Sequence, residues 1–437
     1  MPIGAAPPAV LPAASDAVVR LRDARAATDA LFACMRAEAL RDRPVPERHR
    51  LIFYLGHLEA FDGNLLLPRV PGRAPFRPDF DRLFAFGIDP THGGLPDEPP
   101  GAWPPEDEVR GYVAGVRERL DRLLHDEGPD AAPLLDVALE HRLMHAETLA
   151  WLLRELPEGL KIPPAHAPPR DGAEPAADAV RIPAGVATLG RPRGAPGFGW
   201  DNEFEECALD VPAFEIDVHD VTNARFLRFI EAGGYDERRW WTREGWDWIG
   251  AQGRRHPAQW LPMHDGWRLR AMWEEIDLPL AWPVQVSHAE ACAYARWVGC
   301  ALPSEAQFHR AAFGTPEGDE RRFPWGDAPP DARHGRFGLR DWDFAPAGSH
   351  PAGASAFGVQ DLVGNGWEWT CTPFAPLPGF AALPAYPGYS QPFFDGDHFV
   401  LKGGGPRTAD VLLRRSFRNW FQPRYAHVAA TFRTVRP

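Results

Sequence analysis

Residues 129–156 read PDAAPLLDVALEHRLMHAETLAWLLREL, and their apolar positions recur at the spacing of an amphipathic helix. His141 and His145 lie four positions apart on that helix. At about 100° per residue they are only some 40° apart around the axis, so both imidazoles can meet one metal ion. Glu147 follows about 200° beyond His145, on another face, which makes a site built from these three residues alone sterically unfavourable. A further ligand must therefore come from another helix.

Three earlier segments also predict amphipathic helices. The first begins with a serine–aspartate cap, the second has a proline in its first turn, and the third begins with a run of acidic residues. These segments are residues 15–40, 46–66 and 104–124. Together with the fourth they predict a four-helix bundle, in which facing helices supply metal ligands to the core. His57, near the middle of the second helix, is the natural candidate for the third ligand.

Three neutral imidazoles suit a catalytic metal site, because they leave coordination positions open. Iron, zinc, nickel and copper all accept imidazole nitrogen, so the ligands alone leave the identity of the metal open. A simpler alternative stays open as well, in which these histidines are plain core or surface residues of the bundle.

Composition argues against several classes of protein. The chain has 437 residues, 44% of them hydrophobic, which is enough for two domains with separate cores. A net charge of −13 argues against nucleic acid as a partner. No apolar run approaches the roughly 20 residues that span a bilayer, so we expect no membrane association. The N-terminus lacks the features of a secretory signal, and five scattered cysteines never form CxxC; both favour a cytoplasmic protein with reduced thiols.

The residue composition and the hydrophobic pattern of the sequence change after the helices. Short strand-like runs then alternate with two predicted helices, residues 223–234 and 287–299, and with long loops rich in Trp, Gly and Pro. The predicted class is therefore α + (α+β). The expected domains are a flexible tail at 1–14, a helical bundle at 15–157, a Pro- and Ala-rich linker at 158–179, and an α+β domain at 180–437.

Several phrases in the second half resemble the formylglycine-generating-enzyme/sulfatase-modifying fold, a C-type-lectin-like domain. They are PVQVSHAEACAYARWVGCALPSEAQFHRAA (283–312), FPWGD (323–327), SHPAGASAFGVQDLVGNGWEWT (349–370), FVLKGGGP (399–406) and SFRNWFQPRYAHVAATFR (416–433). The first half, with its HxxxHxE pattern, is similar to a DinB-type bundle. The pair of domains resembles the ergothioneine-type sulfoxide synthases, non-haem iron enzymes that use O2 to join a thiol sulfur to C2 of a histidine-derived imidazole.

This resemblance implies a ligand set and an acceptor site. His57, His141 and His145 would bind Fe(II), and the stretch around Asn419 and Trp420 would hold hercynine, the trimethylammonium form of histidine. An indole face attracts a quaternary ammonium through cation–π interaction, and an amide can position a carboxylate.

The sequence departs from the family pattern where the sulfur donor would bind. The mycobacterial-type enzyme has an acidic residue directly after the Asn-Trp pair, whereas this chain has Phe421, which makes γ-glutamylcysteine an unfavourable donor. Met144 stands where that type has a glutamine beside the second histidine of the helix. The last cysteine is Cys371, so the paired C-terminal cysteines of formylglycine-generating enzymes are missing and their oxidase activity is disfavoured.

The proton donor cannot be assigned from the sequence. The family's Tyr-Pro-Gly-Phe phrase is LPGF here, with Leu377 at its first position. Tyr54, Tyr386 and Tyr389 are the weak candidates that remain.

The sequence keeps the three histidines of the iron site but differs where the sulfur donor would bind. This combination resembles the selenoneine synthase branch of the family, which takes selenium from a selenosugar. The loop DRLFAFGIDPTHGG (81–94) and the helix RHRLIFYLGHLEAFDGNLL (48–66) are similar to that branch. A neutral, hydroxyl-rich donor would use polar and aromatic groups such as Gln422, Arg424 and the 81–94 loop. Three alternatives stay open: a sulfoxide synthase using another thiol, a DinB-type metal-dependent thiol transferase, and a non-catalytic lectin-like binding module.

Overall fold

The chain divides into two compact units in a computed structural model that describes residues 14–69, 76–85, 103–127 and 132–437. The helical unit comprises Met1–Ile162 with Gly194–Phe198, and the mixed unit comprises Pro163–Arg193 with Gly199–Pro437. Of the expected tail at 1–14, only Ala14 falls within the described residues. In the part of the chain that is described, no helix combines the length and the apolar character needed to cross a membrane.

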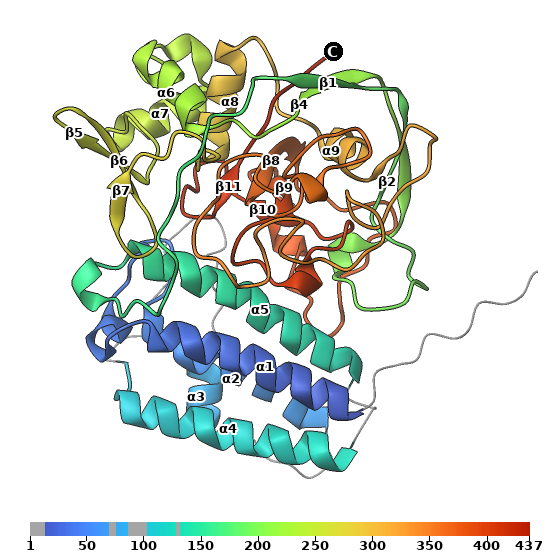
Figure 1. The fold of residues 1–437 in the computed structure, drawn as a ribbon. Helices are drawn as coiled ribbons and strands as arrows, with labels where there is room; N and C mark the ends of the chain where they lie inside the picture. The colour runs from blue at the N-terminus through green and yellow to red at the C-terminus, as the bar shows by residue number, and fades with distance from the viewer. Residues whose placement is uncertain (1–13, 70–75, 86–102, 128–131) are drawn as a thin grey trace, which may run out of the picture. The chain divides into compact units, whose positions relative to one another are not determined.

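Four long helices build the described part of the helical unit (Figure 1). They are α1 (Ala14–Ala33), α2 (Leu51–Leu66), α4 (Glu106–Glu127) and α5 (Ala132–Glu155). Helix α2 packs against both α4 and α5, and α1 packs against α5 and α4, which makes the predicted four-helix bundle. A short helix that we did not predict, α3 (Pro78–Leu83), packs on α2.

Two predicted helix boundaries are wrong, and the first has a tertiary cause. The first helix ends at Ala33 instead of residue 40, because the chain that follows α5 pairs with residues just beyond α1. Met35 forms a β-bridge with Lys161, and the Cys34 carbonyl accepts a 2.7 Å hydrogen bond from the Ile162 amide. The second helix begins at Leu51, not residue 46, since Arg50 is extended at its N-cap.

A cluster of buried charges fixes the register of the bundle. Arg142 of α5 lies 2.6 Å from an Asp62 oxygen and 3.0 Å from a Glu59 oxygen, both on α2, and all three side chains are buried. Glu59 also pairs with Arg117 of α4 at 2.8 Å and lies 3.8 Å from Arg25 of α1. One α2 carboxylate therefore meets cations from each of the other long helices.

Small sheets surrounded by loops make up the mixed unit (Figure 1). One sheet has the order β1-β4-β12, and the central one β10-β9-β8-β11. Their strands are β1 (Ala179–Ile182), β4 (Phe214–Asp217), β12 (Val435–Arg436), β10 (Asn419–Phe421), β9 (Phe399–Gly404), β8 (Gly366–Pro373) and β11 (Ala430–Thr431). The other strands are β2 (Gly185–Leu189), β3 (Cys207–Val211), β5 (Trp260–Met263), β6 (Gly266–Arg270) and β7 (Glu275–Asp277).

The GNGWEWT phrase supplies β8 at the centre of this unit. Trp367 and Trp369 are fully buried, and Gly403 of the adjacent β9 has φ +100°. A Cβ at Gly403 would lie 2.8 Å from the Leu362 carbonyl oxygen, so only glycine fits there. Trp367, Trp369 and Gly403 therefore stabilise the fold of the mixed unit.

The described helices of the mixed unit are α6 (Asn223–Glu231), α7 (Arg243–Ala251), α8 (His288–Trp297) and α9 (Glu305–Phe313). The sequence pattern predicted α6 and α8 but not α7 and α9. Ser304 and Gln307 form a capping box at the start of α9, and Thr242 caps α7. The residues that form both caps were present in the sequence as signals of a helix start.

Residues 163–178, which fall within the predicted linker at 158–179, have no regular structure and belong to the mixed unit. Asp171 accepts hydrogen bonds from the amides of Leu280 and Ala281 at 2.9 and 3.1 Å. The Trp282 indole donates to the Arg170 carbonyl at 2.8 Å. Hydrogen bonds between side chains and backbone groups therefore hold this Pro-rich segment against the mixed unit.

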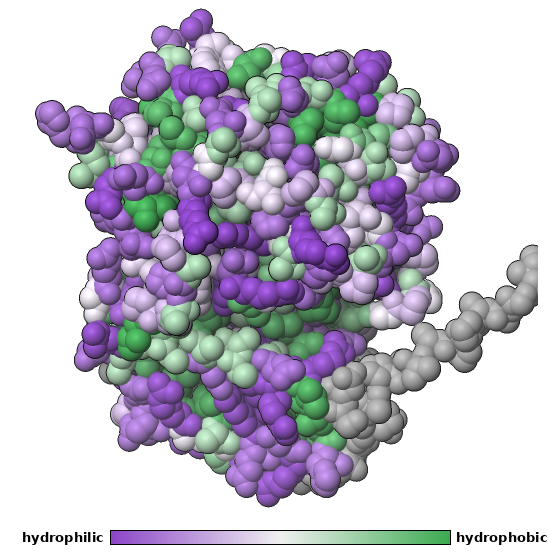
Figure 2. Space-filling view, in the orientation of Figure 1, coloured by the Kyte–Doolittle hydropathy of each residue, from purple (hydrophilic) through white to green (hydrophobic). Residues whose placement is uncertain are grey.

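Hydrophilic residues predominate on the face drawn in Figure 2, and apolar residues are interspersed among them. The exposed large apolar residues are scattered over many elements of the described chain. They are Val19, Ile162, Val186, Leu209, Met263, Leu280 and Val298.

Candidate metal centre

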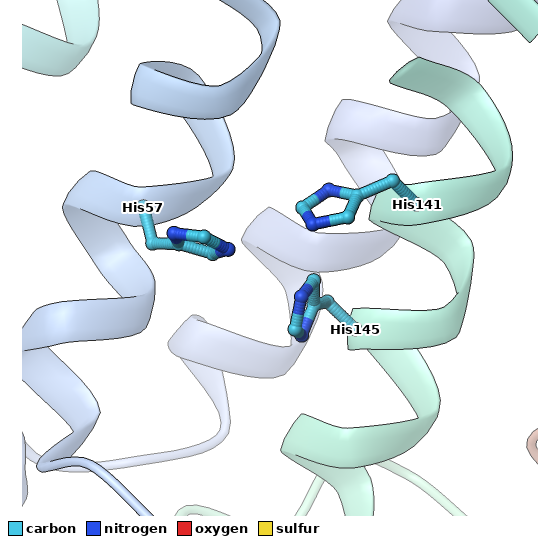
Figure 3. Close-up of side chains that lie close together, drawn as sticks. All are labelled: His57, His141 and His145. Atoms are coloured by element: carbon cyan, nitrogen blue, oxygen red, sulfur yellow. The ribbon is translucent and has the colours of Figure 1, made fainter. Parts of the chain in front are cut away.

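Three histidines converge inside the helical bundle. His57 comes from α2, and His141 and His145 come from successive turns of α5, so that the three rings face one another (Figure 3). One nitrogen from each ring lies within 4.8 Å of the others. An ion with metal–nitrogen bonds of about 2.1 Å holds its ligands within about 4.2 Å of one another, so small ring rotations complete the site.

The surroundings of His57 and His141 fix the planes of their rings. The His57 Nδ1–H donates to the Phe84 carbonyl oxygen at 2.6 Å, and the Phe53 ring stacks on the imidazole at 4.8 Å. His57 Nε2 has no hydrogen-bond partner among the described residues and keeps its lone pair. The Phe61 ring stacks on His141 at 3.5 Å between centroids. Such contacts orient a ligand ring toward a metal.

Burial keeps the three imidazoles neutral. It lowers the pKa of His57 to about 4, and it lowers the pKa of His141 and of His145 well below the ordinary value, with a smaller contribution from the neighbouring rings. A neutral imidazole offers the lone pair that a metal needs. The donor set of three buried, neutral nitrogens therefore fits a divalent transition metal, and it is the predicted set of ligand residues.

Two other predicted residues lie on the same helices. Tyr54 is fully buried one turn before His57, and its ring centre lies 5.9 Å from that of His145. Burial raises the pKa of the Tyr54 hydroxyl to about 12, so the group stays protonated near neutral pH. Met144 is half-buried beside His145 on α5. Glu147, although buried, does not belong to the histidine cluster, as its position around the helix predicted.

The predicted acceptor residues form an edge strand of the mixed unit. Asn419, Trp420 and Phe421 make up β10, which pairs antiparallel with β9, and all three are half-buried. The Trp420 ring stacks on Phe374 at 4.2 Å and meets the edge of Tyr389 at 5.2 Å.

Further residues of the predicted donor end follow β10. Phe421 stacks on Tyr425 with ring centres 5.0 Å apart and planes nearly parallel. Arg424 pairs with Asp397 at 2.9 Å, and the Gln422 carbonyl accepts a 3.0 Å hydrogen bond from the Tyr425 amide. Of the predicted 81–94 loop, residues 86–94 lie outside the described part of the chain.

The predicted tyrosines of the mixed unit lie next to one another. Tyr389 stacks on the buried Trp200 at 3.9 Å, and its ring centre is 5.8 Å from that of Tyr386. Burial raises the pKa of Tyr386. The structure thus groups Tyr386, Tyr389 and Trp420 in one unit, and Tyr54 with the histidines in the other.

Two features that support the histidines were not predicted from the sequence. The Phe84 carbonyl is a backbone group, which no side-chain pattern reveals. The buried carboxylates Glu59 and Asp62 did leave a signal, since two acids interrupt an otherwise apolar helix directly after His57.

Comparison with known proteins supports both halves of the resemblance. Residues 20–182 match the DinB superfamily, and residues 164–437 match the sulfatase-modifying factor enzyme 1-like domain. The predicted architecture, a helical bundle followed by an α+β domain of this second kind, is thereby confirmed.

Curated relatives extend through both units. A hercynine oxygenase of Mycolicibacterium smegmatis is 39% identical over 379 residues, covering 83% of each chain. A hercynine oxygenase of Mycolicibacterium thermoresistibile is 37% identical over 406 residues, covering 88% of this chain and 86% of that protein. Ergothioneine biosynthesis protein 1 of Neurospora crassa is 27% identical over 492 residues, covering 91% of this chain and 55% of that protein. The chain therefore belongs to the ergothioneine-type sulfoxide synthase family of enzymes.

Proposed function

We propose that this protein is a non-haem Fe(II), O2-dependent enzyme that forms a carbon–chalcogen bond at the imidazole C2 of hercynine. We further propose that the chalcogen is selenium from a selenosugar, which makes the protein a selenoneine synthase. The observation that carries the proposal is the cluster of three buried, neutral histidines in a chain similar to hercynine oxygenases over most of its length.

In this proposal His57, His141 and His145 hold the metal, and the protein contributes orientation and exclusion of water. Bound Fe(II) would supply redox chemistry with O2 and open positions for a soft chalcogenolate. Each of the three histidines is less than 10% exposed, so little water competes for those positions. The neutral imidazoles carry no charge that would repel the metal.

We assign proton donation to Tyr54 among the tyrosine candidates. Its ring lies beside His145, and its raised pKa of about 12 keeps the proton on the hydroxyl until a stronger base forms nearby. Tyr386 and Tyr389 pack against each other in the mixed unit, and Tyr389 also contacts Trp420.

We assign hercynine binding to Asn419 and Trp420. The Trp420 indole offers a π-face for the trimethylammonium group, while its stack on Phe374 fixes the plane of that face. The Asn419 amide lies on the same edge strand, where it can position the substrate carboxylate directly or through water.

The chemistry around Phe421 supports a donor other than γ-glutamylcysteine. The ammonium group of γ-glutamylcysteine would bind best beside a carboxylate. At this position the chain has two stacked aromatic rings, Phe421 and Tyr425, instead. A neutral selenosugar needs no such carboxylate. Its hydroxyls would meet polar groups such as Gln422 and Arg424, and its ring could lie against an aromatic face.

Incubation with a panel of donors tests this proposal. The protein is reconstituted anaerobically with Fe(II) and then exposed to air with hercynine and either selenosugars, γ-glutamylcysteine or other thiols. We expect O2 uptake and a selenium-containing hercynine product by mass spectrometry with the selenosugar. Products only from a thiol would instead assign the chain as a sulfoxide synthase, and product formation without O2 uptake would assign a metal-dependent thiol transferase. Both results would contradict the selenoneine proposal.

A further inference from the structure

The short helix α3 ends at the metal centre. Its C-cap residue, Phe84, is fully buried, and the Phe84 carbonyl oxygen accepts the 2.6 Å hydrogen bond from His57 Nδ1. A carbonyl oxygen can only accept, so this contact selects the tautomer with the proton on Nδ1 and the lone pair on Nε2. The ligand nitrogen of His57 is thus defined by a backbone group outside the four long helices.

Gly56, the residue directly before His57, sets the distance between α2 and Phe84. A Cβ at position 56 would lie 2.5 Å from two carbon atoms of the Phe84 ring, so any larger residue must displace that ring. Alanine is otherwise the more favourable residue in a helix, by about 1 kcal/mol. The close approach of the Phe84 ring therefore explains the glycine at position 56. Phe84 is also the residue whose carbonyl oxygen accepts the hydrogen bond from His57.

Side-chain hydrogen bonds anchor α3 to two long helices. The Tyr112 hydroxyl of α4 donates to an Asp81 carboxylate oxygen at 2.6 Å, and the Asn64 amide of α2 donates to the Asp81 carbonyl at 3.1 Å. The Phe84 ring also packs against Tyr112 with centres 5.8 Å apart. These contacts hold the end of α3 in place over α2.

We propose that Gly56, Phe84 and the Tyr112–Asp81 pair are positioning residues of the metal centre, and that they fix the tautomer and the direction of His57 before any metal binds. The inference rests on the proposed role of the three histidines as metal ligands. Orienting partners of this kind change metal affinity by about 10- to 100-fold when they are lost.

Gly56→Ala in the full-length protein is the first test. In the metal-free protein, long-range 1H–15N spectra of labelled histidine report the His57 tautomer, with His57→Gln used for assignment. We expect an Nδ1–H tautomer in the wild type and a mixture in Gly56→Ala, together with a 10- to 100-fold loss of Co(II) affinity. Gly63→Ala is the matched control, because it lies two turns further along α2, away from Phe84, and its Cβ would meet no atom closer than 3.1 Å. An unchanged tautomer and an affinity within about twofold of the wild type would overturn the proposal.

Tyr112→Phe is the second test, because it removes one hydroxyl and adds no volume. We expect weaker Co(II) binding and a changed Co(II) absorption spectrum, with a smaller effect than that of Gly56→Ala. Wild-type affinity and spectrum in Tyr112→Phe would remove the Asp81 pair from the proposal. If the wild type itself binds neither Co(II) nor Fe(II), the metal centre is wrong, whereas the tautomer measured on the metal-free protein still decides the role of Phe84.

Discussion

His57 illustrates how burial keeps a candidate metal ligand neutral. An exposed histidine is partly protonated near its ordinary pKa of 6.5, whereas burial lowers the pKa of this one to about 4. The hydrogen bond to the Phe84 carbonyl opposes the shift but does not cancel it. The ring therefore remains a lone-pair donor across the physiological range of pH.

This shift predicts a pH dependence of stability for the metal-free protein. Between pH 6.5 and about 4 the unfolded chain binds a proton at His57 that the folded chain excludes, so the free energy of unfolding falls as the pH falls. At about pH 5 the expected loss is about 2 kcal/mol for this residue. Urea unfolding at about pH 7.5 and pH 5, with a chelator present, measures it. His57→Gln should lose about 2 kcal/mol less than the wild type, and an identical loss in both proteins would contradict the shift.

Tyr54→Phe tests the proposed proton donor. The hydroxyl is removed without a change of packing volume beside His145, so we expect Fe(II) binding to persist while product formation falls by about 10²-fold or more. Tyr294→Phe is the control, since burial raises the pKa of Tyr294 to about 12 as well and Tyr294 lies in the mixed unit. Wild-type turnover in Tyr54→Phe would exclude the assignment.

Phe421→Asp tests the proposed reason for donor choice. A carboxylate after the Asn-Trp pair would attract the ammonium group of γ-glutamylcysteine, so we expect product from that thiol to rise above the wild-type level. Phe421→Leu removes the same stack on Tyr425 without adding charge and should show no such gain. Equal use of γ-glutamylcysteine by both variants would show that charge at this position does not select the donor.

At the scale of elements, the buried ion cluster joins the two helices that carry the histidines. Glu59 and Asp62 follow His57 on α2, and Arg142 lies between His141 and His145 on α5. A sliding of α2 against α5 would separate both the ion pairs and the imidazoles. The cluster thus ties the register of the bundle to the geometry of the metal site.

Arg142→Met should destabilise the bundle strongly, because it leaves Asp62 buried without its cation and removes one of the cations around Glu59. We expect a loss of about 3–5 kcal/mol in the free energy of unfolding by urea. Arg110→Met is the matched control, since its partner Glu106 lies at the solvent-exposed start of α4 and such pairs contribute less than about 1 kcal/mol. Similar losses in both variants would contradict the role given to the buried cluster.

Across the whole molecule, the features that depend on local residue spacing were predicted from the sequence. The features that depend on contacts between segments distant in the chain were not. The four-residue spacing of His141 and His145 is a local property, and it predicted a shared face correctly. The end of α1 depends on the bridge between Met35 and Lys161, which no local pattern contains. The contact of Phe84 with His57 likewise joins residues 27 positions apart through a backbone oxygen.

The iron content of His57→Ala tests whether His57, His141 and His145 form the metal centre. Wild type and variant are reconstituted anaerobically with Fe(II), desalted, and compared for iron per chain, with circular dichroism to establish that both are folded. Because His57 supplies the only ligand from α2 in the described cluster, we expect one iron per wild-type chain and almost none in the folded variant. A folded His57→Ala protein that keeps one iron per chain and full turnover would contradict the account.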